Sequence, residues 1–128
     1  MDYQASTPVD QRVVEAMSGY LFDRPGNPHA TEHAYGWEAN AAVEKSAATI
    51  ADALNVDKDE VIFTSGATEA NNQAILGLAE NAPPYRKKIL ISSIEHACVL
   101  AAACAALRRY GCSLEIIPVD AYGIIDIE

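Results

Sequence analysis

The sequence predicts an α/β fold: a parallel-type sheet with flanking helices, preceded by two N-terminal helices. From residue 61 onward, short apolar runs alternate with longer segments of helical periodicity, a pattern typical of βαβ units. Before residue 57, the apolar residues recur at helical spacing. We therefore divide the chain into an N-terminal helical segment, residues 1–56, and the start of an α/β domain, residues 57–128.

The N-terminal segment is expected to hold two helices. The first covers about residues 10–22, where one apolar stripe is formed by Val9, Val13, Met17 and Leu21. The turn-forming run 23–28, which contains two prolines and a glycine, ends it. The second covers about residues 37–55, and its expected buried face comprises Val43, Ala47, Ile50, Ala51 and Leu54.

The second segment is expected to contain three buried strands, over residues 61–64, 89–91 and 114–117. Two helices separate them, over about residues 67–80 and 95–110, and Gly111 closes the second helix as a C-terminal cap. In such units helices cover both faces of the sheet. The polar residues 126–128 suggest the start of another helix, so we expect the chain to be part of a longer protein.

Composition narrows the class of function. Half of the residues are apolar and the formal net charge is −9, which disfavours nucleic acid as a partner. The sequence has neither an apolar run long enough to cross a membrane nor the pattern of a signal peptide. Its three cysteines are odd in number and form no CxxC pair, which indicates free thiols, a cytoplasmic location and no zinc motif.

The junction between the first expected strand and its helix is the most informative segment, residues 64–72 (TSGATEANN). The first N–H groups of a helix have no intrahelical partner, and the helix dipole is positive there. Gly66 permits close approach to the backbone, and hydroxyl groups surround it. These features favour a phosphate site. A plain helix cap, with Gly66 as the cap and Glu69 closing a capping box, would explain the same residues.

A second junction follows the next expected strand, at residues 92–96 (SSIEH). Parallel neighbours place their C-terminal loops side by side, so His96 is expected near Ala67. A histidine there can transfer protons near neutral pH or stack on an aromatic cofactor. It can equally cap or pack at the start of a helix.

Taken together, these segments resemble the cysteine desulfurase branch of the class V aminotransferases. The likeness rests on TSGATEANN at 64–72 followed by Glu95-His96, and it extends to the opening segment 2–10, the loop around 26–37 and the segment 119–126. It covers the chain from end to end in the right order. The resemblance implies the large domain of a fold-type I pyridoxal-phosphate transferase, of which only the N-terminal portion is present.

The same resemblance implies roles for particular residues. Ala67 and Thr68 would hold the phosphate of pyridoxal 5'-phosphate, and His96 would stack on its pyridine ring and act in catalysis. Asn27 and His33 are assigned no role beyond turn formation and loop packing. The implied reaction converts L-cysteine to L-alanine and an enzyme-bound persulfide, for iron–sulfur clusters and thio-cofactors. Implied partners are sulfur-acceptor or scaffold proteins and a second copy of the chain, as a homodimer or an altered oligomer.

Parts of the family pattern are missing from this sequence. The lysine that binds the cofactor covalently is matched by none of Lys45, Lys58, Lys87 and Lys88. The persulfide-forming cysteine is not matched either, and Cys98 and Cys104 are expected to be buried with a small apolar role. We therefore expect the chain alone to be inactive and to bind the cofactor weakly at best. Alternatives are a selenocysteine lyase, another class V enzyme, a non-catalytic binding or dimerisation module, or an unrelated small phosphate binder.

Overall fold

The computed structural model describes residues 3 and 6–125, and the chain divides into two compact units with a boundary between Ile62 and Phe63. The first unit contains α1 (Gln11–Phe22), α2 (Ala34–Leu54) and the short 3-10 turn η1 (Lys58–Glu60). The turn η1 packs against α2, which places it in the first unit. The division of the chain into a helical segment and a cofactor-binding domain stays a prediction.

Helix α1 begins as expected but does not bury its apolar stripe. Asp10 caps the helix by accepting a hydrogen bond of 2.8 Å from the backbone N–H of Arg12. None of the residues of α1 is buried, and the exposed fractions of Val13, Met17 and Leu21 are 47%, 52% and 68%. The amphipathic pattern therefore predicted the helix correctly, whereas burial requires a covering element that the described part of this unit does not provide.

Helix α2 starts three residues earlier than the sequence predicted, because His33 caps it through Nδ1, which accepts from the backbone N–H of Gly36. Gly36 is buried, and a Cβ there would collide with the carbonyl oxygen of Ala30, which explains the glycine. Of the expected buried face, only Ala47 and Ala51 are buried. The larger members of that face are exposed: Val43, Ile50 and Leu54.

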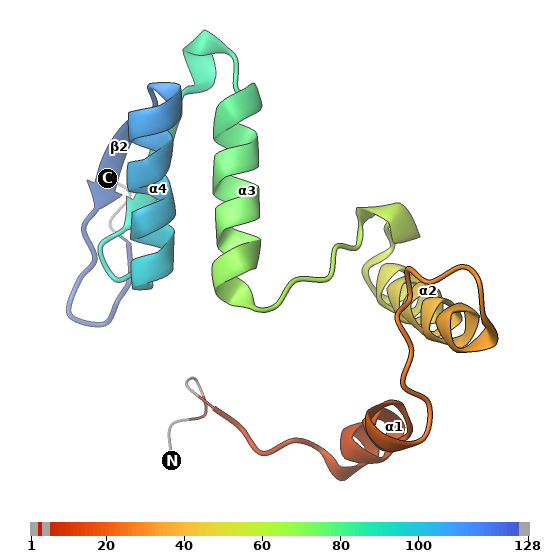
Figure 1. Ribbon diagram of the computed structural model, residues 1–128. Helices are drawn as coiled ribbons and strands as arrows, with labels where there is room; N and C mark the ends of the chain where they lie inside the picture. Colours follow the sequence, from red (N-terminus) through yellow and green to blue (C-terminus); the bar gives the residue numbers. More distant parts are fainter. Residues whose placement is uncertain (1–2, 4–5, 126–128) are drawn as a thin grey trace. The chain divides into compact units, whose positions relative to one another are not determined.

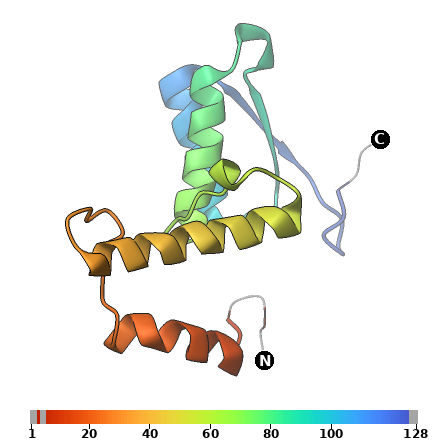
Figure 2. The same ribbon diagram turned by 90° about the vertical axis from the view of Figure 1, so that its right-hand side faces the viewer.

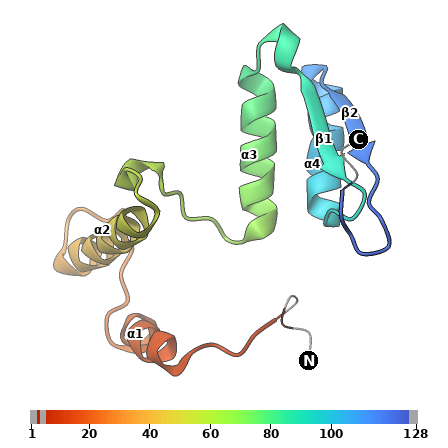
Figure 3. The same cartoon turned by 180° about the vertical axis from the view of Figure 1, so that it is seen from behind.

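The second unit is a βαβ unit preceded by a helix (Figure 1). Its elements are α3 (Ala67–Asn81), the 3-10 turn η2 (Pro84–Arg86), β1 (Lys88–Ser92), α4 (Ala97–Tyr110) and β2 (Ser113–Ile117). The two strands pair in parallel, with Ile89 opposite Leu114. Gly111 ends α4 in the left-handed conformation, with φ of 67°, as the sequence predicted. Seen from behind, β1 and β2 lie in front of α4 (Figure 3).

Two expectations for the sheet are wrong. Residues 61–64 form no strand, since the sheet in the described part of the chain contains only β1 and β2. An extended segment becomes a strand only when another strand accepts its hydrogen bonds, and Ile62 and Phe63 remain 64% and 52% exposed. Within the described residues, helices also do not cover both faces of the sheet: α4 packs against the strands, while Leu90, on the opposite face from Ile91, is 54% exposed.

The core of the second unit consists of small residues that allow α3 and α4 to lie close together. Ala102, Ala103 and Ala106 of α4 are at most 1% exposed. Ala106 joins Ala79 of α3 and Cys112 in one buried cluster. In Figure 1 the two helices run side by side in the same direction, and in Figure 2, turned by 90°, α3 stands in front of α4. Their N-terminal ends therefore lie at the same end of the unit.

Candidate functional site

The candidate site is formed where the N-terminal ends of α3 and α4 meet. Helix α3 follows Gly66 and helix α4 follows His96, a few residues after the carboxyl end of β1. The first N–H groups of each helix point to this end, and the two helix dipoles add positive potential to it. Gly66 contributes no side chain to cap α3. This end of the unit therefore favours a negatively charged group.

A cavity of about 500 Å³ occupies this end of the unit. Its lining residues come from both helix starts and the loop before α3: Ser65, Gly66, Ala67, Thr68, Glu69, Asn71, His96 and Cys98. The structure thus brings together Ala67, Thr68 and His96, as the sequence predicted. The reason differs from the one expected, because helix packing, and not the pairing of two neighbouring strands, brings the two junctions side by side.

Glu69 fixes the loop that precedes α3. Its Oε2 accepts two hydrogen bonds of 2.7 Å, from the backbone N–H and from the hydroxyl of Ser65. These bonds lower the pKa of Glu69, with the side-chain bond from Ser65 as the larger cause. The expected capping box is therefore displaced by one residue, from Gly66 to Ser65. Glu69 keeps a negative charge at the cavity wall, and this charge opposes anion binding.

His96 caps α4 and contacts the thiol of Cys98. Its Nδ1 accepts a hydrogen bond of 3.2 Å from the backbone N–H of Cys98 and lies 3.1 Å from Cys98 Sγ. The imidazole is exposed to solvent. Because Nδ1 is turned toward Cys98, Nε2 is the ring nitrogen left for a group bound in the cavity. His96 can therefore cap α4 through Nδ1 and still present Nε2 to the cavity.

Cys98 is the site residue that the sequence analysis missed. It is half-buried, and Asn71 Nδ2 donates a hydrogen bond of 3.4 Å to its Sγ. Hydrogen bonds with Asn71, then with His96, lower the pKa of the Cys98 thiol, although desolvation acts in the opposite direction. The expected burial is therefore wrong for Cys98, which is half-buried and has the polar partners Asn71 and His96. A cysteine two residues after a histidine, in the first turn of a helix, is the signal that could have identified it.

Residues singled out elsewhere have structural roles. Asn27 Oδ1 accepts from the backbone N–H of His29 at 3.0 Å, which forms a turn, and His33 caps α2. Three of the lysines have partners: Lys58 pairs with Glu44, Lys87 donates to the carbonyl of Tyr110, and Lys88 pairs with Glu115. None of the chain's lysines lines the cavity at the helix starts.

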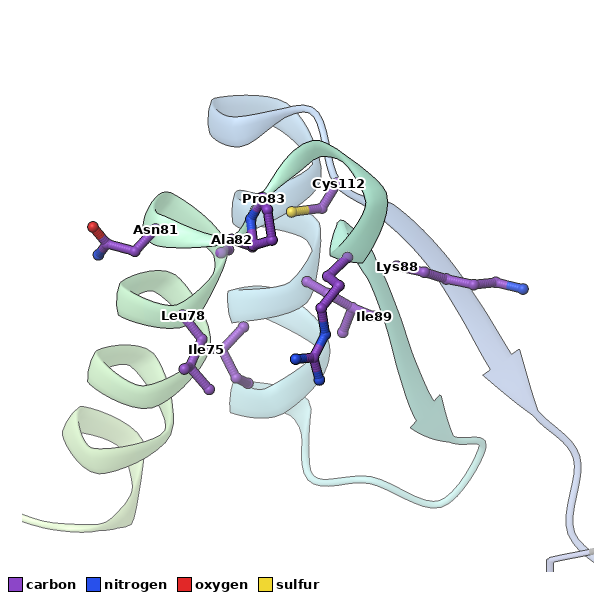
Figure 4. A pocket seen from close by; sticks show the side chains of 10 residues that line it. Ile75, Leu78, Asn81, Ala82, Pro83, Lys88, Ile89 and Cys112 are labelled. Atoms are coloured by element: carbon purple, nitrogen blue, oxygen red, sulfur yellow. The ribbon is translucent and has the colours of Figure 1, made fainter.

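A second cavity, of about 470 Å³, lies toward the opposite end of the same unit. Ile75 and Leu78 of α3, Ile89 of β1 and the loop at Pro83 form its mostly apolar wall (Figure 4). Figure 4 shows Lys88 pointing away from it. Arg86 also lines this cavity, but its lining includes neither a hydroxyl or imidazole side chain nor the start of an α-helix, so we place the functional site at the helix starts.

The described part of the chain shows no cluster of three or more side chains suited to hold a metal ion. Among the described helices, none combines the length and the apolar character that crossing a bilayer requires.

The cavity at the helix starts fits the phosphate of a cofactor such as pyridoxal 5'-phosphate. Ala67 and Thr68 supply backbone N–H groups at the first turn of α3, and Thr68 adds a hydroxyl donor. Glu69 is already engaged by Ser65, which turns its carboxylate toward the loop. The exposed ring of His96 provides a flat surface on the same cavity.

Comparisons with known proteins identify the family of the chain. The family model described as aminotransferase class V matches residues 1–128. Cysteine desulfurase IscS of Rickettsia massiliae is 46% identical over the whole chain, which spans 31% of that relative, its N-terminal portion. A cysteine desulfurase of Pongo abelii is 45% identical, and the chain spans 28% of its length.

Solved structures show the same likeness. A NifS-like protein superposes with a TM-score of 0.84 and 34% identity, over 98% of this chain and 34% of that one. The structure of SspA in complex with cysteine gives a TM-score of 0.76 and 39% identity, over 91% of this chain and 33% of that one. The chain thus spans about a third of the proteins it matches.

Proposed function

The chain belongs to the aminotransferase class V family, and on this basis we propose that its second unit supplies the phosphate-binding part of a pyridoxal-phosphate site in a cysteine desulfurase. The observation that carries the proposal is the shared cavity of Ala67, Thr68 and His96 at two converging helix starts. The curated relatives support the reaction, since they are named cysteine desulfurases.

Ala67 and Thr68 bind the phosphate in this proposal. The N–H groups at the start of α3 have no carbonyl four residues earlier in the helix to accept their bonds. A phosphate oxygen takes that place, and the Thr68 hydroxyl donates a further bond. Since the chain carries a net charge of −9, this local arrangement must overcome a long-range repulsion, which salt screens within about 10 Å.

His96 orients the cofactor ring and exchanges protons with the substrate. When bound, pyridoxal phosphate supplies an electron sink for chemistry at the substrate's α-carbon. The ring of His96 packs against the cofactor, while its Nδ1 stays with the Cys98 backbone, 3.2 Å away. This contact holds the imidazole in one orientation and leaves Nε2 as the ring nitrogen that faces the bound group.

The proposal extends to the whole protein's substrate and setting. L-cysteine is the substrate, which is supported by the solved complex of SspA with cysteine. Sulfur-acceptor or scaffold proteins are the partners, a homodimer is the assembly, and the cytoplasm is the location. Since none of this chain's lysines lines the cavity, we also propose that the chain by itself binds the cofactor weakly and releases no sulfur from L-cysteine.

A binding experiment tests the phosphate site. Pyridoxine 5'-phosphate, which lacks the aldehyde and so cannot react with surface lysines, is titrated by calorimetry against the full chain, with pyridoxine as the phosphate-free control. We expect the phosphate ester alone to bind. Thr68→Val removes one hydrogen bond to a charged group, so affinity falls about tenfold. Thr49→Val, at an exposed hydroxyl of α2 that bonds the Lys45 carbonyl, is the matched control.

Two results would contradict the proposal. Equal binding of pyridoxine and its phosphate would show that the cavity does not recognise the phosphate. Equal loss of affinity in Thr68→Val and Thr49→Val would place the site elsewhere. In a separate assay with L-cysteine, pyridoxal phosphate and a thiol reductant, sustained sulfide release by the chain would refute its expected inactivity.

A further inference from the structure

We propose that Cys98 and His96 form a nucleophile–base pair in this cavity, and that Cys98 exchanges with small anionic disulfides there. The preference for anionic reagents depends on the proposed phosphate site, whereas the reactivity of the thiol does not. Neither the family likeness nor the predicted cofactor roles assign any chemistry to Cys98.

The geometry combines a nucleophile, a base and an open space. Cys98 Sγ lies 3.1 Å from His96 Nδ1, within reach for proton transfer. Asn71, from the neighbouring helix α3, donates to the same sulfur at 3.4 Å and so stabilises the thiolate. Cys98 also lies in the first turn of α4, where the dipole favours a negative charge. All three side chains line the cavity of about 500 Å³, which admits a reagent.

The other two cysteines provide an internal comparison. Cys104 is half-buried in the middle of α4, away from either helix end. Cys112 is 5% exposed and belongs to the core cluster with Ala79 and Ala106. Neither lines the cavity at the helix starts. The chain therefore contains one thiol placed for reaction, one half-buried thiol without that setting, and one enclosed thiol.

The exchange is balanced in atoms and electrons. His96 Nδ1 takes the proton of the Cys98 thiol and gives up its bond from the Cys98 backbone N–H while it holds that proton. The thiolate attacks one sulfur of the reagent's disulfide. A new S–S bond forms to Cys98 while the reagent's S–S bond breaks. The departing thiolate takes up the proton from His96. No further oxidant is consumed, because the reagent's disulfide is reduced as the mixed disulfide forms.

The product would compete with phosphate for the same space. A group bound to Cys98 Sγ projects into the cavity that Ala67 and Thr68 also line. Bound phosphate and the modified thiol should therefore exclude each other. Phosphate binding should therefore weaken as the concentration of small disulfides rises. Thiol reductants should restore it by removing the group from Cys98.

The experiment compares labelling rates at each cysteine of the full chain by peptide mass spectrometry. Iodoacetamide, which is neutral, measures the intrinsic reactivity of the thiol. We expect Cys98 to react about tenfold faster than Cys104 at neutral pH, with a lower pH midpoint, because the thiolate is the reactive form. His96→Asn keeps a helix-capping side chain but removes the base. This substitution should slow the labelling of Cys98 and raise the pH midpoint of that reaction, while the labelling rate of Cys104 stays unchanged. The circular dichroism spectrum is the folding control.

Oxidised glutathione, an anionic disulfide, and cystamine, a cationic one, then test the site's preference. We expect glutathione to modify Cys98 faster, and sulfate to slow its reaction. Equal iodoacetamide rates at Cys98 and Cys104, or a rate in His96→Asn equal to that of the unmodified chain, would overturn the nucleophile–base pair. A fast Cys98 that neither discriminates between the disulfides nor responds to sulfate would support the pair and contradict the phosphate site.

Discussion

The cavity at the helix starts and the sheet of the same unit differ in how many of their interactions the chain itself supplies. At the cavity, Ser65, Glu69, Asn71 and Cys98 satisfy one another through hydrogen bonds of 2.7 to 3.4 Å. On the sheet, Leu90 remains 54% exposed, and the outer edge of each strand has no partner in the described part of the chain.

The difference shows which interactions a short stretch of chain can complete by itself. Most polar contacts of the site join residues two to four positions apart, so they form wherever the two helices form. Covering an apolar face requires a distant element. The site can therefore be preorganised by this chain, whereas the sheet is left to a segment or partner that brings apolar surface of its own.

The packing between α3 and α4 holds the two helix starts together, so disrupting it should have the largest effect. Ala106 is 0% exposed and lies in the core cluster with Ala79. Ala106→Leu adds volume that this contact cannot accommodate, and we expect the free energy of unfolding to fall by about 1–3 kcal/mol. Urea unfolding followed by circular dichroism measures it.

Ala101→Leu is the matched control, because Ala101 is an exposed residue of the same helix. It should change the free energy of unfolding by no more than about 0.5 kcal/mol. Similar effects of the two substitutions would mean that the alanine contact does not hold the helices together, and the cavity would lose its structural basis.

Sequence patterns predicted the elements that depend on near neighbours. The helices α3 and α4, the strands β1 and β2 and the Gly111 cap all agree with the structure to within two residues. Their determinants are local: helical periodicity, a glycine that accepts a positive φ, and turn formers. The proximity of Ala67 and His96 was also predicted, although helix packing and not strand pairing accounts for it.

The errors concern interactions between distant residues. The apolar run 61–64 has strand composition, but whether it pairs depends on a partner strand that composition does not reveal. Helical spacing alone predicts a small apolar role for Cys98, because its partner Asn71 lies 27 positions away on another helix. Helical spacing likewise predicts which residues of α1 share a face, and not whether anything covers that face.

The charge of Glu69 should have a moderate effect on anion binding at the cavity. Glu69→Gln keeps an oxygen that can accept from Ser65 and removes the charge, so we expect sulfate to bind about threefold more tightly. Calorimetry at neutral pH measures the affinity. Sulfate is chosen because it stays a dianion across the pH range, unlike phosphate. Weaker binding by the variant would mean that the loop geometry matters more than the charge.

The pH dependence of sulfate binding tests whether the charge of Glu69 opposes the anion. Hydrogen bonds from Ser65 lower the pKa of Glu69 in the folded chain. As the pH falls through that lowered pKa, Glu69 becomes neutral, so the difference in sulfate affinity between the unmodified chain and Glu69→Gln should disappear. The stability that Glu69 contributes is present above its unfolded pKa and is lost over the same fall in pH.

The smallest effect on stability is expected at the exposed face of the sheet. Leu90 and Ile91 are adjacent in β1, yet Leu90 is 54% exposed and Ile91 is 8% exposed. Leu90→Lys should change the free energy of unfolding by no more than about 0.5 kcal/mol. Ile91→Lys buries a charge against α4 and should prevent stable folding.

Association is the property that Leu90→Lys should change. Exposed apolar residues and unpaired strand edges favour contact between copies, so we expect the mass from light scattering to rise with concentration for the unmodified chain and to rise less for the variant. A constant monomer mass for the unmodified chain would mean that exposure at Leu90 does not drive association. The exposed face of the sheet would then need no covering partner in solution. The cavity and the sheet would differ only in that one is lined by polar groups and the other by apolar groups.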